Sequence, residues 1–143
     1  MVDKSGVITI FHKDYCKEAY CKCSEKEGNQ IKEKYFQING KIEGEYISYY
    51  WNEYIFKKSF YHNGELEGEK ITYHLNGNIM KKCTYQNGKL EGEDNTYTNN
   101  GNIMFKSIYQ NGKLGEVITY FEDGIIYDKR FYQNGKLIHI GIM

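Results

Sequence analysis

Five Asn-Gly pairs recur along the chain at an almost constant spacing. Their glycines are 24, 24, 24 and 23 residues apart, at Gly40, Gly64, Gly88, Gly112 and Gly135. A fixed period in this range is typical of a repeat architecture. Asn-Gly is also the strongest short signal for a β-hairpin, because a two-residue type I′ turn requires positive φ at both central residues. The spacing therefore predicts a series of stacked hairpins.

Each repeat contains further aligned positions. The second residue after each Asn-Gly pair is apolar: Ile42, Leu66, Leu90, Leu114 and Leu137. A glycine follows two residues later at Gly44, Gly68 and Gly92, whereas Gly115 directly follows Leu114 because the fourth copy is one residue shorter. A second turn is predicted in each repeat, at Asn76-Gly77, Asn100-Gly101 and Asp123-Gly124, with Asn52-Glu53 in the corresponding place. We expect a looser turn at Asn52-Glu53, because a left-handed glutamate is unfavourable.

Turns so closely spaced leave no room for a helical crossover between strands, so neighbouring strands must run antiparallel. We predict an all-β fold, an elongated single-layer antiparallel meander of stacked hairpins with roughly twelve strands. Before the regular repeats, strands are predicted at residues 6–12, 15–23 and 30–38 from their β-branched and aromatic content. The prediction is one domain over residues 1–143, with a degenerate N-terminal cap at 1–28 and regular repeats at 29–143.

The glycines inside strands suggest close packing, because glycine otherwise weakens a strand. We expect Gly44, Gly68, Gly92 and Gly115 to make room for aromatic rings of a neighbouring strand. The candidate rings are those of Tyr61, Tyr85, Tyr109 and Tyr132. Equivalent rings would then stack as a ladder along the sheet.

Charge and composition argue against several functions. The chain has 19 Lys+Arg and 19 Asp+Glu, so no net field attracts it to nucleic acid or to an anionic membrane. Basic pairs such as Lys57-Lys58 and Lys81-Lys82 are sparse for lipid binding. The apolar run at residues 7–11 is too short for a signal segment or a membrane span, so we expect a cytoplasmic protein.

The pattern Tyr-x-Asn-Gly-Lys-Leu-x-Gly-Glu resembles the MORN repeat. Its best copies are residues 61–69, 85–93 and 109–116, and the resemblance extends over about residues 29–140. The pattern is closer to the bacterial-type variant of the YwqK-like antitoxin family than to the form with a central tryptophan. The resemblance implies a non-enzymatic protein with a single-layer sheet. Proteins with such repeats act as scaffolds, oligomerise, have been proposed to meet phospholipid headgroups, or serve as antitoxin or immunity partners.

Candidate chemical sites were weighed on the same sequence. Cys16, Cys21 and Cys23, with Cys83 or His12 as a fourth ligand, would supply zinc ligands, but free thiols filling the cap are favoured because no knuckle spacing is present. Cys83 occupies the position of Ser59 and Ser107. The histidines His12, His62, His74 and His139 lie on different predicted strands without convergence.

The repeated glutamates are expected to form a solvated row of ion pairs rather than a catalytic pair. The row comprises Glu45, Glu69, Glu93 and Glu116, with Lys41, Lys89, Lys113 and Lys136 as expected partners. We predict no enzyme activity, no cofactor and no metal.

The expected function is that of a protein-interaction module, which binds its partner on an aromatic face of the sheet. An antitoxin-like or immunity-like role is one form that this function could take. The residues predicted to bind the partner are Tyr50, Trp51, Tyr54, Phe56, Tyr73 and Tyr97. The alternative is a self-associating scaffold, with a place next to a membrane as one option. Open edge strands, including the apolar C-terminal run at residues 137–143, would allow a homodimer.

Overall fold

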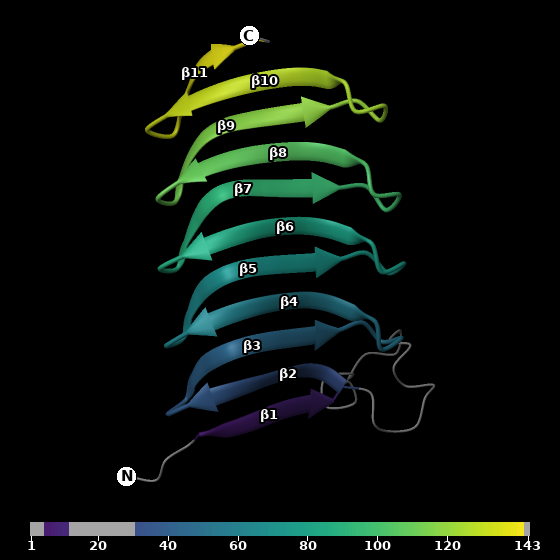
Figure 1. The fold of residues 1–143 in the computed structure, drawn as a ribbon, viewed down its shortest axis with the longest axis vertical. Coiled ribbons are helices and arrows are strands. Elements are labelled where there is room, and N and C mark those ends of the chain that lie inside the picture. Colours follow the sequence, from purple (N-terminus) through teal and green to yellow (C-terminus); the bar gives the residue numbers. More distant parts are fainter. Residues whose placement is uncertain (1–4, 12–30, 142–143) are drawn as a thin grey trace, which may run out of the picture.

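The chain forms one open antiparallel β-sheet, which a computed structural model describes for residues 5–11 and 31–141. Eleven strands of the described residues follow one another in sheet order without a crossover, and the two ends of the chain lie at opposite ends of the stack (Figure 1). The strands are β1 (Gly6–Phe11), β2 (Ile31–Ile38), β3 (Lys41–Tyr49), β4 (Ile55–His62), β5 (Glu65–Tyr73), β6 (Ile79–Gln86), β7 (Lys89–Tyr97), β8 (Ile103–Gln110), β9 (Lys113–Tyr120), β10 (Ile126–Gln133) and β11 (Lys136–Ile140). The predicted all-β meander is confirmed.

The Asn-Gly pairs form the turns that the sequence predicts. His62 pairs with Glu65 across Asn63-Gly64, so two residues close this hairpin. Asn63 has φ 51° and Gly64 has φ 83°, which is the type I′ conformation. The other four pairs have the same signs of φ. All five turns lie on the side of the sheet where strands β2, β4, β6, β8 and β10 end, at the left of Figure 1. This row of strand ends is called the Asn-Gly edge.

The second turns differ from the prediction, because they contain three residues rather than two. At Tyr50–Tyr54, the Tyr50 amide donates to the Tyr54 carbonyl at 2.8 Å and the Glu53 amide donates to the Tyr50 carbonyl at 3.0 Å. Only the last loop residue has positive φ, 72° at Glu53, as expected for a turn followed by a left-handed residue. The predicted looser turn at Asn52-Glu53 is therefore wrong, because Glu53 adopts the conformation of the glycines in its sister turns.

The sheet begins differently from the predicted order. Strand β1 pairs directly with β2, from Gly6 opposite Gln37 to Phe11 opposite Ile31. No described strand lies between them, where the sequence predicts a strand at residues 15–23. That segment, His12 and the cysteines Cys16, Cys21 and Cys23 lie outside the described residues.

The strand glycines have a conformational role instead of the predicted packing role. Gly44, Gly68 and Gly92 do stand opposite the predicted tyrosines, as in the pair Gly92 and Tyr109. However, a Cβ on Gly44 or Gly92 would have no atom within 4 Å, and φ at these glycines is 78°. They lie in bulges where the strand after each Asn-Gly turn has two residues more than its partner. The room that we expected for aromatic rings is therefore not what selects glycine.

The shorter fourth repeat shows the same point by contrast. Ile108 pairs with Glu116 and Tyr109 pairs with Leu114, so Gly115 is the single extra residue of a smaller bulge. Its φ is not in the left-handed region. Deleting one residue from the two-residue bulge has therefore removed the need for a left-handed backbone at this position.

The two faces of the sheet carry different side chains. Alternation along each strand places Ser59, Cys83 and Ser107 on one face, here called the serine face, and Ile47, Ile71 and Ile118 on the other, the isoleucine face. The few buried residues lie in the middle strands, with Ser59 0% and Cys83 3% exposed. Cys83 thus has the small-residue role that the sequence indicates, and the sheet contains no thick core.

The predicted ladder of equivalent tyrosine rings is wrong. Equivalent residues are two strands apart, which corresponds to about 9.5 Å, whereas ring pairs interact at about 4.5–7 Å. Rings therefore contact only where the intervening strand also supplies one. Tyr46 does so, with its ring centroid 5.7 Å from that of Tyr35 and 6.1 Å from that of Tyr61. Later repeats have Lys70, Asp94 and Val117 at the position of Tyr46.

Candidate interaction surfaces

The residues predicted to bind a partner gather near the second turns, along the edge opposite the Asn-Gly edge. Tyr50, Trp51 and Tyr54 belong to one turn, and the Tyr50 ring lies 4.9 Å from that of Phe56 in β4. Tyr50 Oη donates to the carbonyl of Tyr73 at 2.6 Å, and His74 Nε2 lies 3.0 Å from the carbonyl of Tyr97. Each of these contacts joins one second turn to the next hairpin. The structure therefore brings the predicted residues to one edge rather than to the middle of a face.

Sequence reasoning missed most of the apolar residues at this edge. The strand after each second turn has a one-residue bulge near its start, and Phe56, Met80, Met104 and Tyr127 are the bulged residues. Tyr127 forms an edge-to-face pair with Phe121 at 5.0 Å, which repeats the pair of Tyr50 and Phe56. The exposed large apolar residues here are Trp51, Tyr54, Phe56, Leu75, Met104, Phe121, Ile125 and Tyr127. These eight residues are called the apolar edge. The recurrence of the bulged residue, at intervals of 24, 24 and 23 residues, is the sequence signal that could have revealed it.

A shallow pocket lies beside the apolar edge and is bordered by three successive second turns. It has a volume of about 370 Å³ and is lined by Tyr50, His74, Leu75, Asn76, Met80 and Asn99. The Nδ2 groups of Asn76 and Asn78 both donate to the carbonyl of Asn99, at 2.7 and 2.8 Å. These hydrogen bonds fix the spacing between the turn that contains Asn76 and the turn that contains Asn99. They thereby hold the residues that line the pocket in place.

An ion-pair ladder lies on the isoleucine face, but with other lysines than those predicted. Lys58 pairs with Glu45 at 3.1 Å, Lys82 with Glu69 at 3.2 Å and Lys106 with Glu93 at 3.3 Å. Lys129 and Glu116 continue the series. The predicted partners Lys41, Lys89, Lys113 and Lys136 lie beside the Asn-Gly turns instead. Cross-strand neighbours within one hairpin decide the pairing, and each exposed pair contributes little to stability.

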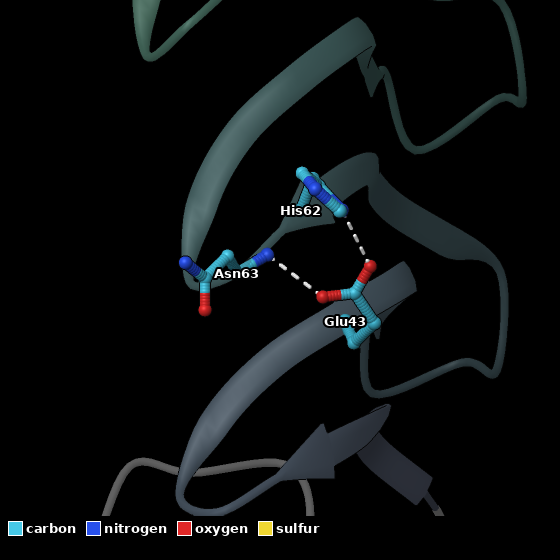
Figure 2. A network of polar contacts seen from close by, with 3 residues as sticks. All are labelled: Glu43, His62 and Asn63. Atoms are coloured by element: carbon cyan, nitrogen blue, oxygen red, sulfur yellow. Dashed lines mark hydrogen bonds and ion pairs between the residues drawn. The ribbon is translucent and has the colours of Figure 1, made fainter.

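A second set of glutamates caps the Asn-Gly turns. The amide of Asn63 donates to Glu43 at 2.7 Å, as Figure 2 shows, and the amides of Asn87 and Asn111 donate to Glu67 and Glu91 at 2.8 and 2.6 Å. Each carboxylate comes from the preceding hairpin, so it joins one repeat to the next. Sequence reasoning did not assign these glutamates a role, although they precede the strand glycines at the repeat period.

The cap of the Asn63-Gly64 turn includes a histidine, and the pKa values of this histidine and of the capping glutamate are both shifted. His62 Nδ1 lies 2.8 Å from Glu43 Oε1 (Figure 2). The hydrogen bond from the Asn63 amide, followed by that from His62, lowers the pKa of the Glu43 carboxyl from its ordinary value. The bond to Glu43 raises the pKa of His62. His62 is exposed, and its pair with Glu43 adds a second hydrogen bond to the carboxylate that caps the turn.

Cys83 and Asp94 are two further titratable groups that are buried on the serine face. Burial, followed by the charge of Asp94, raises the pKa of the Cys83 thiol, which keeps it protonated and weakly nucleophilic. Asp94 is itself paired with Lys81 at 3.2 Å. Residues 5–11 and 31–141 contain no group of three or more potential metal ligands among His, Cys, Asp and Glu. Nor do they include a helix that could cross a membrane.

Comparison with protein families agrees with this geometry. The MORN repeat variant matches residues 66–87 and 113–134. These two segments are similar to MORN repeats. Each matched segment runs from the strand after one Asn-Gly turn to the asparagine of the next turn, so one match equals one structural repeat. MORN repeats are commonly modules for interaction with proteins or membranes and are generally non-catalytic. No curated protein matches the chain.

Proposed function

We propose that this chain is a non-catalytic, cytoplasmic module that binds a partner protein through its apolar edge, in the manner of an antitoxin or immunity protein. The carrying observation is the row of exposed apolar side chains at that edge, where Tyr54 is 57% and Tyr127 61% exposed. Aromatic residues and methionine are enriched in protein interfaces, and a contiguous apolar row is uncommon on a surface that meets only water. The six predicted partner-binding residues, Tyr50, Trp51, Tyr54, Phe56, Tyr73 and Tyr97, belong to this proposal.

The rigidity of the edge supports the same proposal. The hydrogen bonds from Tyr50 to Tyr73 and from Asn76 to Asn99 hold successive second turns in register. Preformed apolar anchors lose little conformational freedom on binding, which favours affinity. A partner would therefore meet a regular series of anchors instead of a flexible loop.

A matched pair of variants in one strand tests the proposal. Phe56 and Phe60 both lie in β4, with 37% and 38% of their surface exposed, but only Phe56 belongs to the apolar edge. A tagged chain is used for capture from the native host at physiological salt, followed by mass spectrometry. We expect one stoichiometric partner that is retained by Phe60→Ala and lost with Phe56→Ala and with Tyr54→Ala. Equal retention by Phe56→Ala and Phe60→Ala would exclude the apolar edge as the binding surface.

Self-association is a second candidate, and strand β11 favours it. All five of its residues are exposed, including Ile138 at 60% and Ile140 at 57%, and its outer edge has no neighbouring strand in the described chain. Such an edge is a template for pairing with a second copy. Sedimentation velocity over a range of concentrations distinguishes the two functions, because a scaffold forms concentration-dependent species that Ile140→Lys suppresses. Recovery of only the chain itself in the capture experiment would also favour the scaffold.

A further inference from the structure

The Asn-Gly turn at Asn134-Gly135 lacks the contacts that join the three turns before it, at Asn63, Asn87 and Asn111, to their preceding hairpins. At Asn63, Asn87 and Asn111, here called the regular steps, a glutamate accepts a hydrogen bond from the amide of the turn asparagine, at 2.6–2.8 Å. The fourth repeat lacks the corresponding residue, because Gly115 follows Leu114 directly. Within residues 5–11 and 31–141, no carboxylate accepts a hydrogen bond from the amide of Asn134.

The amide of the neighbouring glycine, Gly135, also lacks the hydrogen bond that is made in the regular steps. In the regular steps it donates to a strand carbonyl of the preceding hairpin, as from Gly88 to Leu66 at 3.0 Å and from Gly112 to Leu90 at 2.9 Å. Among the described residues, no such bond joins Gly135 to Leu114. Pairing of β9 with β10 ends at Glu116 and Phe131, one position earlier than the corresponding pair of Gly92 and Tyr109.

Packing between successive turns also stops at this step. The side chain of Lys89 lies against Gly112, with its Cβ 3.4 Å from the position that a Cβ on that glycine would take. At Gly135 the equivalent space is open to 4 Å. Lys113, which occupies the position of Lys89, is therefore exposed beside the last turn and not packed against it.

A depression of about 400 Å³ lies between the last two Asn-Gly turns, where these contacts are missing. It is lined by Gln110, Asn111, Lys113, Leu114, Gly115, Tyr132, Gln133 and Asn134. The equivalent depression between the first two turns contains Glu43, whose carboxylate binds His62 and Asn63. The site at Asn63 therefore shows that a carboxylate fits the place that is open at Asn134.

We propose that the depression at Asn134 is a carboxylate-binding site, which takes an aspartate or glutamate side chain of a partner protein. Two adjacent backbone amides of a turn, at Asn134 and Gly135, form a concavity that favours an anion. The ammonium group of Lys113 adds a positive charge, and hydrogen bonds to a carboxylate are stronger than those between neutral groups. A side chain rather than a small metabolite is the expected ligand, because each of the three filled sites takes a glutamate presented by a neighbouring strand. The choice of a partner protein rests on the proposed function, whereas the carboxylate chemistry does not.

Acetate is the probe for the carboxylate chemistry, with amide chemical shifts as the readout. Titration with sodium acetate is compared with sodium chloride at equal ionic strength. We expect saturable shifts of the Asn134 and Gly135 amides, with a dissociation constant weaker than about 1 mM because one small ion makes few contacts. The amides of Asn87 and Asn111, which Glu67 and Glu91 already cap, are controls in the same spectrum. Shifts at Asn134 no larger than at these controls would overturn the site.

Two variants test the structural cause. Insertion of a glutamate between Leu114 and Gly115 restores the 24-residue spacing, so we expect the chain itself to fill the depression and the acetate response of Asn134 to disappear. Conversely, Glu91→Ala removes the cap of Asn111, and this amide should gain an acetate response. A response at Asn134 that survives the insertion would contradict the proposed site.

The capture experiment identifies the source of the carboxylate. We expect the insertion variant to retain at least about tenfold less partner than the unmodified chain, as for loss of about 1.4 kcal/mol of binding free energy. If acetate binds but the insertion leaves partner capture unchanged, the ligand is a free carboxylate and the partner assignment is wrong. If the unmodified chain captures no partner, the proposed function fails, and the acetate titration still decides the carboxylate chemistry.

Discussion

Backbone conformation at single residues explains much of what is regular in this chain. Positive φ occurs at the Asn-Gly turns, at the last residue of each second turn and at Gly44, Gly68 and Gly92. Asparagine and glycine tolerate this conformation best, so they mark these positions in the sequence. Glu53 is the exception, because its φ of 72° places a long side chain in the left-handed region. The two backbone hydrogen bonds of its own turn, which recur in the sister turns, hold Glu53 in this conformation.

The two kinds of strand glycine are predicted to respond differently to alanine. Gly92→Ala should lower the free energy of unfolding by about 1–2 kcal/mol, the cost of a left-handed residue with a side chain. No steric term contributes, since a Cβ on Gly92 has no atom within 4 Å. Gly115→Ala should have no effect or stabilise by up to about 1 kcal/mol, because its φ is not left-handed. Urea unfolding measures both, and equal losses would contradict the conformational explanation.

At the scale of the element, contacts at both edges join hairpins of the first repeats to their neighbours. Glutamates cap the Asn-Gly turns, and side chains such as Tyr50 and His74 reach carbonyls of the next hairpin at the second turns. These contacts recur with the repeat, so one substitution can be compared with unaltered copies in the same molecule. Where one residue is missing, in the fourth repeat, the contact at the Asn-Gly edge is lost.

The cap at Glu43 and His62 makes stability depend on pH. The lowered pKa of Glu43 means that its contribution is present above the ordinary pKa of 4.5 and is lost as pH falls through the lowered value. The raised pKa of His62 means that its contribution is complete below 6.5 and is lost as pH rises through the raised value. The stability difference between the unmodified chain and His62→Gln should therefore be largest between pH 4.5 and 6.5.

Glutamine is the appropriate replacement, because Gln86 and Gln110 occupy the same position in the sister repeats. Urea unfolding of both proteins near pH 3, 5.5 and 9 measures the difference on either side of this window. A difference that does not change with pH would show that the histidine acts through packing and not through its charge.

The whole molecule is a one-dimensional array of strands. Each strand pairs only with its sequence neighbours, and no second layer covers either face in the described residues. Stability of such an array is approximately a sum of local terms and nearest-neighbour interfaces. Central strands have two neighbours, whereas β11 has one, and its residues are all exposed.

Hydrogen exchange should therefore be graded along the stack. Amides of β5 to β8 are expected to exchange more than about tenfold more slowly than those of β11, because end strands open locally with little cost. Exchange followed by mass spectrometry or by amide resonances measures this gradient. Equal protection of β11 and the central strands at low protein concentration would contradict it, whereas protection that rises with concentration would indicate pairing of β11 with a second copy.

Much of this fold follows from local sequence. Asn-Gly pairs and the 24-residue period determine the hairpins, their order and the antiparallel sheet, because turn conformation and short connections leave few alternatives. The sequence also indicated the small-residue position at Cys83 and several aromatic residues of the apolar edge. It did not reveal the bulged residues of that edge, such as Met104 and Tyr127, because a bulge depends on the register of two strands.

Tertiary structure decided which side chains meet across strands. Glu45 pairs with Lys58, whereas Glu43 caps Asn63. The sequence alone does not show which of the two glutamates takes which partner. The same holds for the strand glycines, whose role became clear only from φ and from the space around them. Turn chemistry is local and can be predicted from residue types, whereas contacts between strands depend on register and on bulges, which only the assembled sheet determines.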